Sequence, residues 1–224
     1  MKLLHGDSLI LMKDMQSETI DCIITDPPYL MNYKSNRRVV QEKFNHIAND
    51  TNEGFIVEYI KECFRLLKNN SGFYCFCSWH KIDVFKQEIE KYFKIKNIIV
   101  WNKNNHGSGD LSGSYAPKHE FIIFAHKGRA LNKSKRIPDV IDCKKISSNN
   151  LTHPTEKPQE LLETFILNNT NENDVVLDGC MGTGSLGIAC KKLKRDFIGI
   201  ELDEEYHKIA TERINDALVS EDEQ

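Results

Sequence analysis

The turn Asp26-Pro27-Pro28-Tyr29 holds the residue types best suited to chemistry in this chain. It follows the apolar run Cys22-Ile23-Ile24, so it lies where a buried parallel strand would end, the edge at which open α/β sheets bind ligands. Two prolines fix their φ angles and hold Asp26 and Tyr29 in a stiff turn. The carboxylate can accept hydrogens from an amino group while the phenol ring stacks on a flat molecule. A nucleobase fits these groups; a proline-rich loop with Tyr29 as a packing anchor is the alternative.

A glycine-rich turn in the last quarter of the chain indicates a nucleotide-binding unit. Val175-Val176-Leu177 has the pattern of a buried strand that ends at Asp178, and Gly182-Thr183-Gly184 precedes a helical stretch. A further strand at 197–200 leads to Glu201, 19 residues after Gly182. This is close to the spacing of about 20 residues at which an acidic side chain meets the ribose hydroxyls in a βαβ unit. The pattern predicts a nucleoside-binding half-sheet.

The glycines leave two cofactor classes open. Gly182, Gly184 and Gly187 spell the G-x-G-x-x-G pattern of nicotinamide and flavin sites. Asp178 favours another class, because a carboxylate just before the glycine turn would repel a pyrophosphate and attract a cationic amino-acid head group. S-adenosylmethionine carries a positive ammonium and a positive sulfonium. The sequence therefore favours S-adenosylmethionine.

In their order along the chain, these motifs resemble those of the β group of DNA amino-methyltransferases. The resemblance covers nearly the whole chain and implies an α/β fold with a doubly wound, mostly parallel sheet of the S-adenosylmethionine-dependent methyltransferase type, in a single domain of residues 1–224. Gly179-Cys180 stands where the family usually carries Pro-Phe, and we expect a more mobile loop there. The matching segments, besides the two turns and Glu201, are His5-Gly6-Asp7, Lys118-His119-Glu120-Phe121 and His153-Pro154-Thr155-Glu156-Lys157-Pro158.

The resemblance also implies site residues. It places Asp26, Pro27, Pro28 and Tyr29 in catalysis, Asp7 at the cofactor's adenine and Glu201 at its ribose. Asp7, which follows a short strand, also suits a plain helix N-cap. The expected cofactor-binding residues are Asp7, Asp26, Thr155, Lys157, Asp178, Gly182, Gly184, Glu201 and Leu202.

The expected reaction follows from the chemistry of an exocyclic amino group, which is a poor nucleophile because its lone pair is delocalised. By accepting its hydrogens, Asp26 and a proline carbonyl would localise that lone pair for direct methyl transfer. The base must leave the duplex, and stacking on Tyr29 would offset about 1–3 kcal/mol of the cost. An aspartate at the first position is usual in the adenine methylases of the group, so the resemblance predicts N6-adenine. Cytosine-N4 methylation, a nicotinamide-dependent oxidoreductase and a nucleic-acid-binding module without catalysis are the alternatives.

Basic residues gather in one stretch although the whole chain has a net charge of −3. Between Lys127 and Lys145 there are seven basic residues against Asp139 and Asp142. A solvated loop has the same composition, but beside a base-handling turn we expect phosphate contacts with duplex DNA. Long loops tend to be functional or disordered, so 30–53, 102–117 and 127–150 are the expected DNA-contacting or target-recognition segments. The expected DNA-binding residues are Arg37, Arg38, Lys127, Arg129, Lys133, Lys135 and Arg136.

Composition agrees with an enzyme that works in the cytoplasm. The chain has 224 residues, 40% of them hydrophobic, enough to bury a sheet on both faces. It lacks an apolar run of about 18 residues and a signal-peptide pattern, so we expect neither a membrane span nor secretion. Its seven cysteines lie mostly in apolar segments, as reduced core thiols do, and we expect no metal site. A homodimer and a cognate restriction endonuclease are partners that the sequence leaves open.

Hydrophobic periodicity predicts strands that alternate with helices, as in a mostly parallel sheet. The expected strands are 2–4, 20–24, 73–76, 98–101, 121–124, 175–177 and 197–200. The expected helices are 55–68, 82–93, one that begins near Pro158, one between Gly184 and Leu193, and 206–217.

Overall fold

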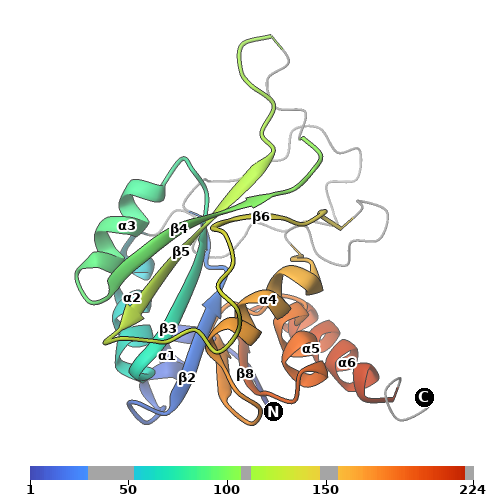
Figure 1. Cartoon of the computed structure of the whole chain (residues 1–224). Helices are drawn as coiled ribbons and strands as arrows, with labels where there is room; N and C mark the ends of the chain where they lie inside the picture. The colour runs from blue at the N-terminus through green and yellow to red at the C-terminus, as the bar shows by residue number, and fades with distance from the viewer. Residues whose placement is uncertain (30–52, 107–111, 147–155, 220–224) are drawn as a thin grey trace.

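The computed structural model describes residues 1–29, 53–106, 112–146 and 156–219, which build an eight-stranded sheet in the order β1-β8-β7-β2-β3-β5-β4-β6 (Figure 1). Neighbouring strands pair in parallel except at β5, which is antiparallel to both β3 and β4. The predicted mostly parallel sheet is therefore confirmed. The strands are β1 (Lys2–His5), β2 (Ile20–Thr25), β3 (Leu67–Cys77), β4 (Lys94–Asn102), β5 (His119–Lys127), β6 (Val140–Asp142), β7 (Val175–Asp178) and β8 (Asp196–Glu201).

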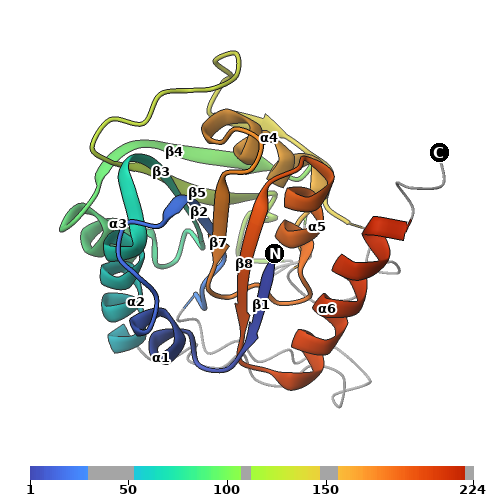
Figure 2. The same ribbon diagram turned by 90° about the horizontal axis from the view of Figure 1, so that it is seen from below.

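Helices cover both faces of the sheet, as Figure 2 shows, with α1 to α3 on one side and α4 to α6 on the other. Successive side chains of a strand point to opposite faces, so Ile23 packs under the first group of helices and Ile24 under the second. This double cover explains why the central strands are apolar on both faces. The helices are α1 (Ser8–Lys13), α2 (Glu53–Leu66), α3 (Ile82–Glu90), α4 (Gln159–Asn169), α5 (Ser185–Lys192) and α6 (Glu204–Val219).

The carboxyl ends of the parallel strands meet at one edge of the sheet, and the reversed strand β5 brings its first residues to the same edge. Cys77 at the end of β3 pairs with Phe121, and Trp101 near the end of β4 pairs with Glu120. Residues far apart in sequence therefore meet at this edge. It also receives the predicted acidic residues Asp7, Asp26, Asp178 and Glu201, each at or just after the end of its strand.

Two short elements are absent from the predicted helices and strands, although the N-cap alternative for Asp7 implied a helix after it and is confirmed. The helix α1 has only six residues and is capped by Asp7, whose Oδ1 accepts from the backbone nitrogen of Leu9 at 2.8 Å. The three-residue strand β6 lies inside the basic stretch and forms by pairing with the outer strand β4, where Val140 faces Val100. Both depend on local capping or tertiary pairing and not on an apolar period.

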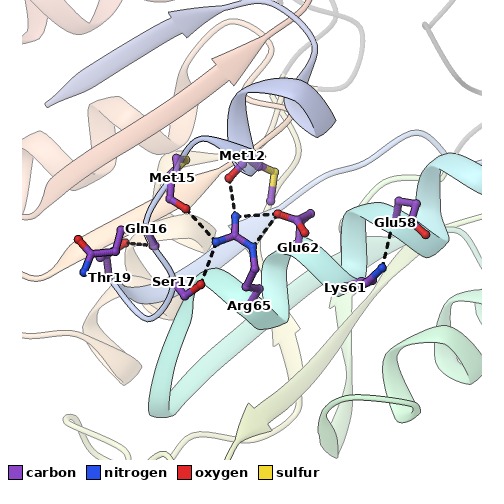
Figure 3. Close-up of polar contacts among 9 residues, drawn as sticks. All are labelled: Met12, Met15, Gln16, Ser17, Thr19, Glu58, Lys61, Glu62 and Arg65. Carbon is purple, nitrogen blue, oxygen red and sulfur yellow. Dashed lines mark hydrogen bonds and ion pairs between the residues drawn. The ribbon is translucent and has the colours of Figure 1, made fainter.

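Arg65 of α2 fixes the segment that leads into β2 (Figure 3). Its guanidinium donates to the carbonyl oxygens of Met12 at 2.6 Å and Met15 at 2.8 Å, and to Ser17 Oγ at 3.0 Å. Glu62, one turn earlier in α2, accepts from Arg65 Nη2 at 2.7 Å and keeps the guanidinium in place. These bonds satisfy carbonyls at the end of α1 and tie the start of β2 to α2. Strand β2 in turn carries the Asp26-Pro27-Pro28-Tyr29 turn at its far end.

None of the helices in the described ranges is long and apolar enough to cross a bilayer. All seven cysteines are free thiols. Within the same ranges no group of three metal-ligating side chains is present.

Candidate active site

Asp26 and Tyr29 face each other across the turn that follows β2. The Tyr29 hydroxyl donates to Asp26 Oδ1 at 2.5 Å, which is short and typical of a bond to a charged acceptor. Pro27 between them is buried, while Asp26 and Tyr29 are half-buried. The Tyr29 ring also packs against the core under α4 and α5, so it is partly an anchor. The turn therefore presents a carboxylate and an aromatic ring side by side.

Lys157, which the family resemblance places at the cofactor, contacts the carboxylate of Asp26. Its ammonium lies 2.5 Å from Asp26 Oδ2 and 3.5 Å from the Tyr29 hydroxyl. The side chain is 8% exposed, and Nζ lies 4.9 Å from the centre of the Phe76 ring. Both oxygens of Asp26 therefore have a donor.

Glu120 completes the charged cluster from β5. Its Oε1 forms an ion pair with Lys103, and its Oε2 lies 3.5 Å from Lys157 Nζ. Oε2 is shielded from water and makes no hydrogen bond within the described part of the chain. The sequence pointed to Glu120 only through a family motif and gave no sign of Lys103 as its partner.

The pKa directions in this cluster follow from burial opposed by charge. Burial raises the pKa of Asp26 above its ordinary 3.8, more than Lys157 lowers it. Burial alone would lower the pKa of Lys157, but the charges of Asp26 and Glu120 raise it above 10.5. Burial alone would raise the pKa of Glu120, but Lys157 and Lys103 lower it below 4.5. Lys157 and Glu120 are thus held charged, whereas burial works against the charge of Asp26.

Glu201 organises the glycine turn. Its Oε2 accepts from the nitrogen of Gly182 at 2.9 Å and its Oε1 from the nitrogen of Asp203 at 2.8 Å. Gly184 has a φ of 80°, and a Cβ there would lie 2.9 Å from Ile214 Cδ1, so α5 and α6 approach as closely as only glycine allows. Each carboxylate oxygen of Glu201 keeps a second lone pair for a ribose hydroxyl.

Asp178 is a buried carboxylate without a cation. Its Oδ1 accepts from Thr25 Oγ1 at 3.0 Å and from the nitrogen of Cys180 at 3.0 Å. Burial raises its pKa to about 7, and no ion pair to it is present in the described ranges. A buried acid of this kind fits a ligand with a positive head group, as S-adenosylmethionine has.

The Gly179-Cys180 pair, which departs from the family pattern, has a packing reason. The nitrogen of Gly179 donates to the hydroxyl of Tyr59 at 3.1 Å, a bond that a proline could not make. A Cβ at position 179 would overlap the Tyr59 ring, which is fully buried. The loop is thus held by defined hydrogen bonds, which oppose the greater mobility expected from its sequence.

Arg213 of α6 links the glycine turn to the segment that carries Lys157. It donates to the carbonyl oxygen of Thr183 at 2.9 Å and to its Oγ1 at 2.8 Å, and it forms an ion pair with Glu156. Gln159 Nε2 adds a bond to the carbonyl oxygen of Ser185 at 3.0 Å. Arg213 was missed because it lies in a helix whose pattern otherwise indicates core packing.

Of the remaining residues expected to bind the cofactor, some lie at the carboxyl edge and one lies outside the described residues. Asp7 caps α1 beside β8, where Gly6 donates to the carbonyl oxygen of Glu201 at 2.9 Å. Leu202 follows β8 and is 44% exposed at the same edge. Thr155 lies outside the described residues, as do Arg37 and Arg38 of the expected DNA surface.

The structure does not bring the basic stretch as a whole to the catalytic turn. Lys127 lies at the opposite, amino edge, where it donates to the carbonyl oxygens of Phe64 at 2.9 Å and Leu67 at 2.7 Å. Its ammonium therefore has a structural role in these contacts. The next residues begin at the amino edge and cross toward β6 (Figure 1), with Arg129, Lys133, Lys135 and Arg136 exposed. Lys144 and Lys145 follow β6 and are also exposed.

Comparisons with known proteins agree with this geometry. A family model described as DNA methylase matches residues 20–212. The type II methyltransferase M2.DpnII of Streptococcus pneumoniae is 31% identical over 239 residues, 96% of this chain and 89% of that protein. The DNA adenine methyltransferase YhdJ of Escherichia coli (strain K12) is 30% identical over 252 residues, which cover 95% of this chain and 82% of that protein. The solved M1.HpyAVI-SAM complex has a TM-score of 0.75 and 31% identity, over 96% of this chain and 98% of that one.

Proposed function

We propose that this chain, which belongs to the DNA methylase family, transfers a methyl group from S-adenosylmethionine to the N6 amino group of adenine in duplex DNA. The main support for this proposal is the hydrogen bond between the ends of the adjacent strands β2 and β7. Thr25, which precedes Asp26, donates to Asp178 Oδ1 at 3.0 Å, so the amino-group acceptor and the acid for the cationic cofactor lie side by side. Membership of a methylase family leaves no support for the nicotinamide or non-catalytic alternatives.

The residues of the turn act on the nucleophile. Bound S-adenosylmethionine would supply the methyl group and leave as S-adenosylhomocysteine, and the proton that the amino nitrogen gives up would pass to the Asp26 carboxylate. Asp26 accepts an amino hydrogen and localises the nitrogen lone pair, and a carbonyl oxygen of the proline turn accepts the other. Tyr29 stacks on the flipped base, and its hydroxyl, donating to Asp26, keeps the carboxylate oriented.

The cofactor is held by the acids of the neighbouring strand ends. Asp178 pairs with its cationic head group, and Glu201 accepts from its ribose hydroxyls while it holds the glycine turn. Burial of Asp178 without a counter-ion supports this assignment. The other residues proposed for cofactor contact are Asp7, Thr155, Gly182, Gly184 and Leu202.

Adenine is favoured over cytosine by the first residue of the turn and by a relative. The residue is Asp26, and YhdJ, 30% identical, is named as a DNA adenine methyltransferase. Both bases carry an amino group that the turn could hold, so the geometry alone does not separate them. Cytosine-N4 methylation is the alternative product.

We propose DNA contact in the long segments that the sequence indicates, parts of which lie outside the described residues. We place it in 30–53 and 102–117 and, within 127–150, foremost on Lys144 and Lys145, because these follow β6 at the carboxyl edge. The chain acts as one methyltransferase domain in the cytoplasm. A homodimer and a cognate restriction endonuclease are its candidate partners.

The test is the identity of the product. Plasmid DNA from a host without adenine methylases is incubated with the protein and S-adenosylmethionine, digested to nucleosides and analysed by mass spectrometry. We expect N6-methyldeoxyadenosine and no methylated deoxycytidine. N4-methyldeoxycytidine as the main product would contradict the choice of base, and the absence of any methylated nucleoside would contradict the proposed activity.

A further inference from the structure

Glu120 is a half-buried carboxylate, 21% exposed, with a role in neither base nor cofactor binding so far. Its Oε1 is held by Lys103, but its Oε2 has no hydrogen bond in the described ranges and is closed to water. Its contact there is the ion pair with Lys157 at 3.5 Å, which is too long to replace the lost water fully, so the oxygen stays poorly satisfied at a cost in free energy. A second arrangement in which Oε2 accepts a hydrogen bond would remove this cost.

Asp26, by contrast, has a donor on each carboxylate oxygen. Tyr29 donates to its Oδ1 and Lys157 to its Oδ2, each at 2.5 Å. An ammonium on Oδ2 draws electron density from the oxygen that must accept an amino hydrogen of the base. Oδ2 keeps a second lone pair, but it accepts an amino hydrogen more strongly when the ammonium has withdrawn.

Lys157 stands between the two carboxylates. Its Nζ is 2.5 Å from Asp26 Oδ2 and 3.5 Å from Glu120 Oε2, above the Phe76 ring. The longer distance needs to shorten only to about 2.8 Å to become a charge-assisted hydrogen bond. The backbone beside Lys157 can stay in place during this shift, because the ion pair from Arg213 to Glu156 anchors it.

We propose that Glu120 is a positioning residue for methyl transfer: when the target amino group donates to Asp26, the Lys157 ammonium shifts to Glu120 Oε2. The inference rests on the proposed function. Lys103 supports the exchange by helping to keep Glu120 ionised. Burial alone would raise the pKa of Glu120, but the charges of Lys157 and Lys103 lower it below 4.5. The ammonium keeps an anionic partner throughout, while Asp26 exchanges the ammonium for an amino hydrogen of the base and keeps the bond from Tyr29.

The first test is Glu120→Gln, measured as the single-turnover rate of methyl transfer to unmethylated plasmid DNA. The amide still fits the space, but it offers one oxygen where the carboxylate offered two, so Lys157 stays on Asp26. We expect the rate constant to fall about 10- to 100-fold, as for the loss of one hydrogen bond to a charged group, with calorimetric affinity for S-adenosylmethionine unchanged. Glu90→Gln, the same change in an exposed ion pair with Lys86, is the matched control.

The second test is a double-mutant cycle with Lys157→Gln. Without the ammonium there is nothing for Glu120 to receive, so adding Glu120→Gln should slow transfer no further. The inference is overturned if the two losses multiply, if Glu120→Gln equals the control, or if its rate and cofactor affinity fall together. Failure of the wild type to methylate DNA would instead contradict the proposed function.

Discussion

The hydroxyl of Thr25 donates to the carboxylate of Asp178 at 3.0 Å, and this bond joins the end of β2 to the end of β7. The single hydrogen of Thr25 is used there, so the Tyr59 hydroxyl, 2.7 Å away, donates to Thr25. Tyr59 in turn accepts from the nitrogen of Gly179. A hydrogen-bond chain thus runs from α2 through the end of β2 to the loop after β7, and a change in one of these groups should affect the others.

Asp178 should destabilise the fold at neutral pH. Burial raises its pKa to about 7, whereas the pKa in the unfolded chain is about 3.9. Between these values the folded protein holds a proton that the unfolded chain has lost, so stability falls as pH rises and the full penalty is present above pH 7. Asp178→Asn should therefore raise the free energy of unfolding by about 1–4 kcal/mol at pH 8 and by less at pH 5, measured by urea denaturation. Equal gains at both pH values would contradict a raised pKa.

The same acid predicts how cofactor affinity depends on pH. A cationic head group needs Asp178 ionised, so affinity for S-adenosylmethionine should rise about 10-fold from pH 6 to pH 8 relative to Asp178→Asn. Calorimetry on both proteins provides the comparison, and ionisation of the cofactor itself cancels between them. Parallel pH profiles would place the head group elsewhere.

Tyr59 should act on the cofactor loop from inside the core. Tyr59→Phe leaves the buried nitrogen of Gly179 without an acceptor, so we expect a loss of about 1–3 kcal/mol in unfolding free energy, together with weaker S-adenosylmethionine binding. Tyr115→Phe, at a fully exposed site, is the control. Wild-type cofactor affinity in Tyr59→Phe would show that the loop does not depend on this bond.

The stacking role of Tyr29 and its hydrogen bond to Asp26 should be separable by mutation. Tyr29→Ala should lose most of the transfer rate with only a small fall in melting temperature, because the ring packs on the core but is half-buried. Tyr29→Phe keeps the ring but not the bond to Asp26, so it should fall between Tyr29→Ala and the wild type. Thermal unfolding and single-turnover rates test this, and a large drop in melting temperature for Tyr29→Ala would favour the packing-anchor interpretation.

The fold was largely predictable because the strands that form its centre are apolar on both faces. Runs such as Cys22-Ile23-Ile24 and Val175-Val176-Leu177 located β2 and β7 and, with the residues that follow them, the acids at the carboxyl edge. The sequence could not show β6, whose three residues pair only because β4 is an open neighbour. It also gave no sign that β5 runs against the other strands.

The charged cluster of the site was not predictable from spacing. Lys157 and Asp26 are 131 residues apart, and their contact depends on strand order and on the Arg213 anchor. Lys127 was grouped with basic neighbours by composition, yet its ammonium binds backbone carbonyls of α2 and β3 at the amino edge. Composition gives the number of charged residues in a segment, but their contacts depend on the fold.

Asp26 carries the central claim, and Asp26→Ala tests it most directly. Wild-type and variant protein are given the same unmethylated plasmid DNA and S-adenosylmethionine, and N6-methyldeoxyadenosine is measured by mass spectrometry after a single turnover. We predict product from the wild type and a loss of at least about 100-fold in the variant, the scale for one group that stabilises the transition state, while circular dichroism and cofactor affinity stay close to wild type. A variant that forms N6-methyldeoxyadenosine at a rate near that of the wild type would contradict the account.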